Sequence, residues 1–568
     1  MKQTSREHSA DAAHPPAGSG IELQLKVVVL VCGAVLMSLE IIGSRIISPY
    51  FGHSIYVWGS LISIFLGALS LGYYIGGRVA DKHPSLRLLG SIIAVAGITM
   101  LVLRYISPAV CNAVYETHLG PKWGTLITCL ILFFIPSVLL GVVSPFSVRL
   151  ATLTVANVGK TAGMLYALST VGSIVGTLVT SFVLIDMMGT NTVVLLLGIT
   201  LIAISLVAVA GPLPRLRQIN APVFLSLVAL PVAICFSPSQ HLGIMAKGDQ
   251  IKYEVDSPYQ HIVVSEGPAK DQLKRRNLQF DRYIESAIYV PENEKTADPR
   301  FIRAATAYTD MMHLPMVFNP QIKTVLQIGG GGGTVPREYY YHYGFDKAGT
   351  PVPGFDVQVA EIDPRVAQVA EMFFYFTPTA NLRVTVDDGR MFLRNSHKTY
   401  DTILIDAFSG GGQIPFHLTT KEFVTEVKSH LSPNGVAAMN VISALRGGRG
   451  ELYLSIYRTW RQVGFGQIYV FPKVERSYEP PLQYDQSRNI ILLATMSRER
   501  LSASDIALGA LGLYQDGILK IDNTVQHAKN YLPGENDLDF EKIPLDPELK
   551  DARVLTDDFA PVELMARE

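Results

Sequence analysis

The stretch VLQIGGGGGTVPRE, residues 325–338, places five consecutive glycines between a run that predicts a buried strand and a run that predicts a helix. Glycines at such a turn allow positive φ and let a ligand approach main-chain N–H groups at a helix N-terminus. An ordinary turn has no need for the conformational entropy that five glycines lose on folding. We predict a ligand-binding loop, with a flexible turn as the alternative. Its candidate cofactor-binding residues are Gly329, Gly330, Gly331 and Gly332.

Acidic residues stand at the ends of three predicted strands: Glu361 closes DVQVAE, Asp388 follows LRVTVD, and Asp406 closes YDTILID. Parallel strands bring their carboxyl ends to one edge of a sheet. A carboxylate after the second strand can accept both ribose hydroxyls of a nucleoside, and one after the third can accept the exocyclic amine of adenine. The pattern favours an S-adenosyl sulfonium ligand; strand-end caps or surface carboxylates are the structural alternative.

Two other ligand classes fit poorly. A nicotinamide cofactor would need Gly or Ala where Thr334 stands, and the acidic residue comes about 30 positions later rather than about 20. The net charge of −1 provides no global basic field for nucleic acid. The densest basic run, KDQLKRRN at 270–277, is expected to be a solvated hairpin loop.

These residues need a scaffold, and the 568-residue chain contains two kinds of sequence. Long apolar blocks dominate residues 25–236, whereas turns and charges reach globular frequencies from residue 245 onward. Windows able to cross a membrane lie at 25–48, 55–77, 86–106, 123–147, 161–186 and 190–210, with a shorter seventh at 220–236 that contains Pro222 and Pro231.

The soluble part alternates strand-like and helical runs, which predicts a parallel, doubly wound sheet. The strand-like runs lie at 323–328, 356–361, 381–386, 400–406, 434–441 and 466–471. The expected fold is an α-helical polytopic membrane bundle plus an α/β Rossmann-like, S-adenosylmethionine-type domain with an N-terminal β-hairpin region. The expected parts are a disordered polar N-terminus at 1–22, a transmembrane domain of about seven helices at 23–240, a β-hairpin and substrate-cleft region at 245–318, and a Rossmann-like domain at 319–568.

Charges near the membrane segments bear on topology. Glu40 and Arg45 are costly at membrane depth, so we expect them to face other helices or a wet cavity, or to neutralise each other. The distribution of Lys and Arg around the predicted helix ends places the amino terminus in the cytoplasm. Seven spans would then put the soluble part on the external face, and a re-entrant seventh segment would leave it inside. We expect a multi-pass protein of the bacterial inner membrane, with the external, periplasmic face slightly favoured.

Residues 39–82 resemble the membrane region of bacterial proteins in which a multi-helix segment is fused to a spermidine synthase-like domain. Within them, GGRVADK at 76–82 is similar to a loop motif of major facilitator transporters. The soluble part contains, in order, SPYQHIVV (257–264), LQFDRYIES (278–286), AYTDMMHLPM (307–316), the glycine loop, AEID (360–363), DDGR (387–390) and LIDAF (404–408). This order and spacing resemble the polyamine aminopropyltransferases, such as spermidine synthase. LTDDFAPVE at 555–563 resembles the membrane-fused branch and has no mechanistic role assigned.

The resemblance implies roles for individual residues. Gln260 and Tyr308 match residues that line the substrate cleft, Glu361 and Asp388 match nucleoside-binding acids, and Asp406 matches the catalytic aspartate. We accordingly assign Asp406 and Tyr308 to catalysis. Assigned to the S-adenosyl ligand, besides the four loop glycines, are Gln260, Glu361, Asp388 and Gly389.

The chain also departs from the family pattern. Gly332 stands where the family has an aspartate for the donor's amine, Ser409 where it has a second aspartate for the acceptor, and Glu285 where it has a glutamine. Tyr308, Ser409 and Glu285 are the expected substrate-binding residues. Without the loop acid, both decarboxylated and intact S-adenosylmethionine are candidate donors.

The expected function is transfer of an aminopropyl or aminocarboxypropyl group from an S-adenosyl donor to an amine acceptor, with release of methylthioadenosine and no metal. A methyltransferase on the same cofactor framework is one alternative. A transporter or sensor that binds an S-adenosyl metabolite without turnover is another. The expected partners are the small-molecule acceptor, membrane lipid and, as the resemblance implies, a second copy of the chain in a homodimer, but no nucleic acid.

Overall fold

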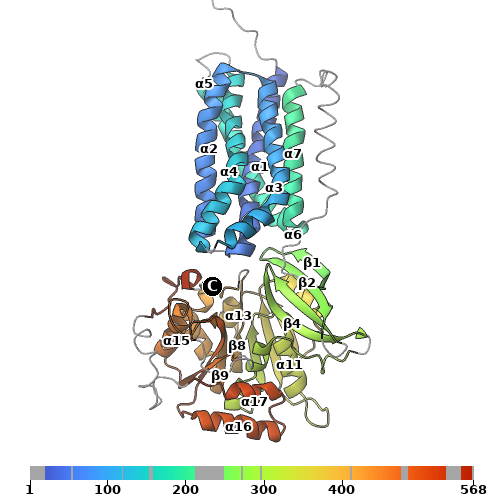
Figure 1. Cartoon of the computed structure of the whole chain (residues 1–568), viewed down its shortest axis with the longest axis vertical. Helices are drawn as coiled ribbons and strands as arrows, with labels where there is room; N and C mark the ends of the chain where they lie inside the picture. The colour runs from blue at the N-terminus through green and yellow to red at the C-terminus, as the bar shows by residue number, and fades with distance from the viewer. Residues whose placement is uncertain are drawn as a thin grey trace, which may run out of the picture. The chain divides into compact units, whose positions relative to one another are not determined.

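The structure is a computed structural model, and its chain separates into two compact units, Met1–His241 and Leu242–Glu568 (Figure 1). It describes residues 19–52, 55–117, 119–152, 158–210, 248–269, 273–294, 297–409, 412–474, 484–532 and 552–565.

The first unit is a bundle of long apolar helices. Among the described residues, six helices are long and apolar enough to cross a membrane. These spans confirm the first six predicted windows, and the seventh, at 220–236, lies outside the described residues. The helices are α1 (Ser19–Phe51), α2 (Ile55–Lys82), α3 (Leu86–Tyr115), α4 (Gly120–Ala151), α5 (Val158–Val179), continued by the π-turn η2 (Thr180–Leu184) and α6 (Ile185–Met187), and α7 (Thr190–Ala210).

Helix α1 begins at Ser19, inside the segment 1–22 that the sequence predicts to be disordered. Glu22 and Lys26 form an ion pair of 2.7 Å one turn apart, which supports the first turns. The Gln24 amide donates to the backbone oxygens of α7 at Val207, 2.5 Å away, and at Ala208, 3.0 Å away. The polar residues at the start of α1 are therefore helical, because they form an ion pair within α1 and hydrogen bonds with α7.

Small residues bring the helices of the bundle together. A Cβ atom at Gly172 or Gly176 of α5 would lie 2.0 or 2.2 Å from a backbone oxygen of α1, so glycine is required there. Such close approach is typical of helix packing in membranes, where van der Waals contact replaces the hydrophobic effect. Glu40 and Arg45 are half-buried on α1, and the expected neutralisation between them stays a prediction.

The second unit begins with a four-stranded antiparallel sheet in the order β1-β2-β3-β4. Its strands are β1 (Gln250–Asp256), β2 (His261–Pro268), β3 (Leu273–Phe280) and β4 (Tyr283–Pro291). The basic run at 270–277 is largely a strand, not the solvated loop we expected, because residues from Leu273 onward form β3. Arg276 is buried there; its guanidinium donates to Glu266 at 2.6 Å and pairs with Glu294 at 2.7 Å. These carboxylates explain how an arginine is tolerated inside the sheet.

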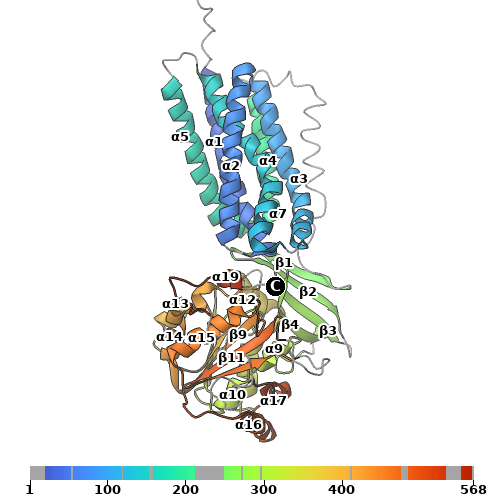
Figure 2. The same ribbon diagram turned by 60° about the vertical axis from the view of Figure 1, so that its left-hand side comes forward.

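A seven-stranded sheet follows, in the order β10-β11-β9-β8-β5-β6-β7. Figure 2 shows two of its neighbouring strands, β9 and β11. The strands are β5 (Thr324–Ile328), β6 (Asp356–Glu361), β7 (Leu382–Val386), β8 (Tyr400–Ile405), β9 (Leu431–Ser443), β10 (Gln467–Pro472) and β11 (Arg488–Thr495). The predicted Rossmann-like fold class is confirmed, and all six predicted strands are present. The six predicted strands run in one direction, and the seventh strand, β11, which the sequence analysis did not predict, runs antiparallel to its neighbours β9 and β10.

Apolar side chains on alternating positions fill both faces of this sheet. Val325 contributes to one buried cluster, while Leu326 and Ile328 contribute to the other. This alternation is expected for a strand buried on both sides. Packing on both faces fixes where β5 ends and hence where the glycine loop begins.

Candidate active site

The glycine loop joins β5 to α11 (Thr334–Tyr343) at the carboxyl edge of the sheet. Gly329, Gly331 and Gly333 have φ values of 87°, 50° and 66°, in the left-handed region that favours glycine. A Cβ atom at Gly329 would lie 2.3 Å from the backbone oxygen of Asp406. The loop therefore needs glycine for its backbone conformation and for close contact with the end of β8.

Glu361 ends β6 and is tied to this loop. Its Oε2 accepts the N–H of Gly330 at 2.7 Å and that of Gly331 at 3.4 Å, and its Oε1 accepts the N–H of Asp363 at 3.0 Å. Burial raises the pKa of Glu361, although these backbone hydrogen bonds oppose the rise. The carboxylate thus shapes the loop, and its nucleoside-binding role stays a prediction.

Asp388 caps the N-terminus of α13 (Gly389–Asn395). Its Oδ1 accepts the N–H groups of Arg390 and Met391, each at 3.0 Å, and its Oδ2 lies 3.0 Å from Nε2 of His417. The hydrogen bond with His417 holds the pKa of Asp388 below its usual value. The sequence analysis missed His417, because it lies outside every recognised motif, 29 residues beyond Asp388.

Gly389 and Gly332 are both crowded. A Cβ atom at Gly389 would lie 2.2 Å from the Ile328 side chain, so glycine lets α13 approach β5. A Cβ atom at Gly332 would lie 2.7 Å from Oγ of Ser286 and 3.0 Å from the Phe374 ring. Ser286 and Phe374 therefore occupy the space beside the loop position that lacks the family's aspartate.

Asp406 follows β8 and lies in a polar cluster. The Asn440 side chain donates to its Oδ1 at 2.9 Å. Burial of the carboxylate raises the pKa of Asp406 to about 6, while hydrogen bonds from Asn440 and Tyr308 oppose that rise. The Tyr308 hydroxyl, on α9 (Ala307–Met311), also lies 2.8 Å from the backbone oxygen of Glu285, to which it can donate. Asp406, Tyr308 and Glu285, all predicted site residues, are thus brought together.

The Glu285 side chain, on β4, adds a second carboxyl group to this cluster. Burial raises the pKa of Glu285 to about 8, and the charges of Asp406 and Asp281 contribute to the rise. At neutral pH Glu285 is mainly protonated and Asp406 mainly ionised. Two nearby carboxyl groups with separated pKa values are a recurring feature of acid–base sites.

Gln260 and Ser409 lie in turns around the site. Gln260 is buried, and its backbone oxygen accepts from the N–H and hydroxyl of Ser257. The Ser409 hydroxyl donates to the backbone oxygen of Gln413 at 3.0 Å, so it closes a turn after β8. That engagement leaves substrate binding by Ser409 a prediction.

The strand order places the site residues along one edge of the sheet. Backbone hydrogen bonds link Asp406 to Ile328, Gly329 to Ala360, and Asp387 to Glu361, at 2.9, 2.9 and 3.0 Å. The ends of β8, β5, β6 and β7 thus stand side by side. Asp406, the glycine loop, Glu361 and Asp388 follow one another in that order.

Comparison with known proteins identifies this architecture. Residues 305–470 match the spermine/spermidine synthase domain. The polyamine aminopropyltransferase of Vibrio vulnificus (strain CMCP6) is 31% identical over 318 residues, covering 56% of this chain and 91% of that relative. The chain belongs to the polyamine aminopropyltransferase family. This match confirms the predicted family and enzyme class.

Other similarities of this aminopropyltransferase are partial. Spermidine synthase of Solanum lycopersicum is 28% identical over 200 residues, covering 34% of this chain and 50% of that relative. A probable spermidine synthase structure from Corynebacterium glutamicum ATCC 13032 gives a TM-score of 0.37 at 21% identity, covering 46% of this chain and 88% of that one. The structure of spermidine synthase from Thermotoga maritima gives a TM-score of 0.34 at 20% identity, covering 50% of this chain and 85% of that one.

Proposed function

We propose that this chain is a membrane-bound transferase that moves an aminopropyl or aminocarboxypropyl group from an S-adenosyl donor to an amine acceptor. Methylthioadenosine is the other product. The observation that carries the proposal is the line of sheet-edge residues, with the glycine loop, Glu361 and Asp388 on one side and the Asp406 cluster on the other.

The nucleoside part of the donor is assigned to Glu361 and Asp388. Each carboxylate oxygen can accept more than one hydrogen bond, so the contacts within the protein leave acceptor capacity for ribose hydroxyls and an adenine amine. The protein contacts also hold both carboxylates in place, which lowers the cost of ordering them on binding.

The transfer step is assigned to the Asp406 cluster. The acceptor nitrogen attacks the methylene carbon beside the sulfonium; a C–N bond forms, the C–S bond breaks, and its electron pair neutralises the sulfur. A proton leaves the nitrogen, and we assign the Asp406 carboxylate, ionised above a pKa of about 6, as its acceptor. Asn440 holds that carboxylate by a hydrogen bond, and the Tyr308 hydroxyl lies beside it.

The site departs from the family pattern at the position expected to bind the amino end of the donor. Gly332 provides no carboxylate, and Ser286 and Phe374 fill the adjacent space. A donor that keeps its carboxylate meets no repelling acid at this position, so intact S-adenosylmethionine and its decarboxylated form are both proposed donors.

The six apolar helices support a multi-pass location in the bacterial inner membrane. Six spans would leave the soluble unit on the side of the amino terminus, which positive-inside counting places in the cytoplasm. A seventh span at 220–236 would put it on the periplasmic face, which is the placement we propose. A reporter active only in the periplasm, fused after Glu568, tests this: no signal there and strong signal from a cytoplasmic reporter rule out the seventh span.

One incubation tests the proposed reaction. Purified full-length protein is mixed with an amine acceptor and labelled S-adenosylmethionine, or its decarboxylated form, and the nucleoside product is identified. Methylthioadenosine supports the proposal, whereas S-adenosylhomocysteine indicates methyl transfer and unchanged donor indicates binding alone. Asp406→Asn protein is the matched control for non-enzymatic breakdown of the donor.

A further inference from the structure

Residues 552–565, here called the C-terminal strap, carry the LTDDFAPVE motif, which the proposed function does not use. The strap packs on α14 (Lys421–Ser429) and α15 (Glu451–Val463). Leu555 is fully buried; its oxygen accepts the N–H of Lys421 at 2.8 Å, and its N–H donates to Thr459 at 2.9 Å. The strap therefore has a specific seat on the domain.

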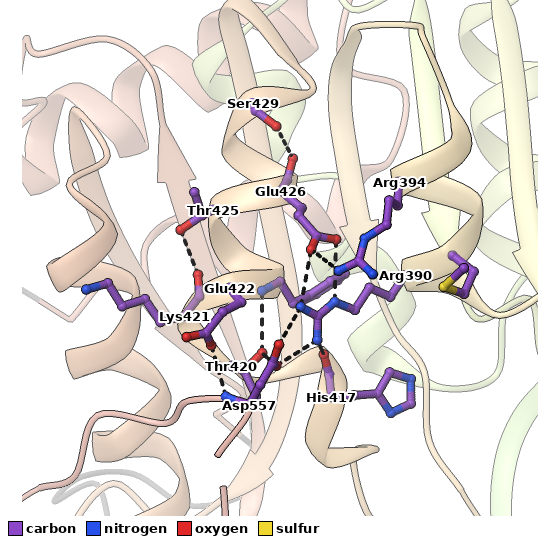
Figure 3. Close-up of polar contacts among 12 residues, drawn as sticks. Arg390, Arg394, His417, Thr420, Lys421, Glu422, Thr425, Glu426, Ser429 and Asp557 are labelled. Carbon is purple, nitrogen blue, oxygen red and sulfur yellow. Dashed lines mark hydrogen bonds and ion pairs between the residues drawn. The ribbon is translucent and has the colours of Figure 1, made fainter. Parts of the chain in front are cut away.

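Asp557 lies at the turn of the strap and faces Arg390 of α13 (Figure 3). Its two oxygens accept from Nη1 and Nη2 of Arg390 at 2.7 and 2.9 Å, a bidentate pair. The Thr420 hydroxyl donates to the same carboxylate at 2.7 Å, and the Asp557 N–H donates to Glu422 at 3.0 Å. Asp557 is thus fixed by both its side chain and its backbone.

Arg390 connects the strap to other parts of the domain. Its guanidinium also contacts Glu426 of α14, with Nη2 to Oε1 at 3.2 Å, and donates to the backbone oxygen of His417 at 3.3 Å (Figure 3). Only 9% of the Arg390 side chain is exposed, whereas 44% of Asp557 is. A buried cation that joins three segments fixes their relative positions more than a surface pair does.

The same arginine also contacts the proposed nucleoside edge. The Arg390 backbone N–H donates to Oδ1 of Asp388, while the His417 ring contacts Oδ2 of Asp388. Arg390 therefore holds both groups that set the position of the Asp388 carboxylate: the first turn of α13 through its backbone and the His417 segment through its side chain. Among the described residues no contact joins Asp557 directly to Asp388, and Arg390 contacts both of them.

We propose that Asp557 is a positioning residue for nucleoside binding, and that the C-terminal strap acts through Arg390 to hold Asp388 and His417 in the geometry that accepts the adenine of the donor. This inference rests on the proposed function, because it takes Asp388 as a nucleoside-binding residue. Loss of the Asp557 carboxylate releases one side of the Arg390 guanidinium, which turns toward Glu426 and no longer fixes the His417 segment.

Calorimetric titration of the full-length protein with methylthioadenosine tests the inference. Asp557→Asn keeps the shape but loses the charge-assisted pair, and we expect affinity to fall about tenfold. The donor KM should rise while kcat at saturation changes little, since the partners of Asp557 are Arg390, Thr420 and Glu422 and not the Asp406 cluster. Asp558→Asn is the matched control, because this neighbouring carboxylate is exposed; the affinity of this variant for methylthioadenosine should equal that of wild type.

A double-mutant cycle separates positioning from general stabilisation. His417→Ala and Asp557→Asn should each weaken binding, and the double variant should be little weaker than His417→Ala, because both act on one path. Additive losses overturn the inference, as does wild-type affinity in folded Asp557→Asn protein.

If Asp557→Asn does not fold, Asp557→Glu, which keeps the charge and shifts the carboxylate, is the deciding variant. Unchanged affinity for methylthioadenosine overturns the inference, and weaker binding supports it. Failure of the wild type itself to bind methylthioadenosine removes the proposed function instead, a result that the wild-type titration alone identifies.

Discussion

The side chain of Asn440 donates to the Asp406 carboxylate at 2.9 Å, and the Asn489 side chain donates in turn to Asn440 at 3.1 Å. Asn440 lies on β9 and Asn489 on β11, the neighbouring antiparallel strand. Two amides on rigid strands thus orient the carboxylate and stabilise its ionised form, against the burial that favours its protonated form.

Replacing Asn440 tests this relationship. The hydrogen bond from Asn440 lowers the pKa of Asp406, so Asn440→Ala should raise that pKa above its value of about 6. We expect the acidic limb of the kcat/KM profile to move up by about one pH unit, with activity lost near pH 6–7 and recovered at higher pH. Asn489→Ala should shift the limb less in the same direction. An unmoved limb in Asn440→Ala would show that Asp406 does not control it.

Asp406→Asn addresses the chemical step. Asparagine keeps the shape and can still accept a hydrogen bond, but it cannot take a proton at neutral pH. Turnover should fall by about 10²–10⁴, while the affinity for the donor stays within a few-fold of wild type. Single-turnover rates and methylthioadenosine titration measure the two quantities separately. A variant that retains most of the wild-type rate rules out Asp406 as the base.

Glu361→Ala addresses the nucleoside. Loss of two charge-assisted hydrogen bonds to a ribose should remove about 3 kcal/mol, more than a hundredfold in methylthioadenosine affinity. Glu361 also accepts the Gly330 and Gly331 N–H groups, so its loss can disturb the glycine loop. Affinities are therefore compared only in variant protein whose thermal unfolding matches that of wild type. Wild-type affinity in such protein contradicts the nucleoside assignment.

The sequence predicted the strand-end carboxylates because their positions depend on local patterns. The strand-like runs before Gly329 and up to Glu361 predicted β5 and β6, so the positions of these two residues followed directly. His417, Asn440 and β11 were missed for a different reason. Their importance arises from contacts over long sequence separations: His417 meets Asp388 29 residues away, and Asn489 meets Asn440 49 residues away. Neither contact leaves a periodic or short-motif signal.

Glu285→Gln tests the half-buried carboxyl group whose pKa is raised. An acid whose pKa rises from 4.5 to about 8 on folding binds its proton more tightly in the folded state. Its contribution to stability is present below the unfolded pKa and is lost as pH rises from about 4.5 to 8. Glutamine removes this titration, so the thermal unfolding temperature of the variant should fall less than that of wild type across this range. Equal pH dependence would contradict the burial of a titrating carboxyl group at Glu285.

The identity of the donor is open to a harsher test, in which Gly332→Asp and Ser409→Asp are combined to introduce the family's acids. A carboxylate at position 332 should repel a donor that keeps its own carboxylate and attract the amine of a decarboxylated donor. If the native donor is S-adenosylmethionine, its KM should rise about tenfold or more in the double variant, while that of the decarboxylated form should fall.

The structure adds a steric requirement to this test. A side chain at position 332 meets Oγ of Ser286 at 2.7 Å, and that hydroxyl lies 3.2 Å from the Thr334 hydroxyl. Ser286→Ala should therefore accompany the two aspartates, and Ser286→Ala alone, with Gly332→Asn in the same background, controls for size without charge. The charge-dependent part of the change in donor KM is the difference between the Gly332→Asp and Gly332→Asn variants. If S-adenosylmethionine and its decarboxylated form respond equally to that difference, position 332 does not contact the end of the donor where the two molecules differ.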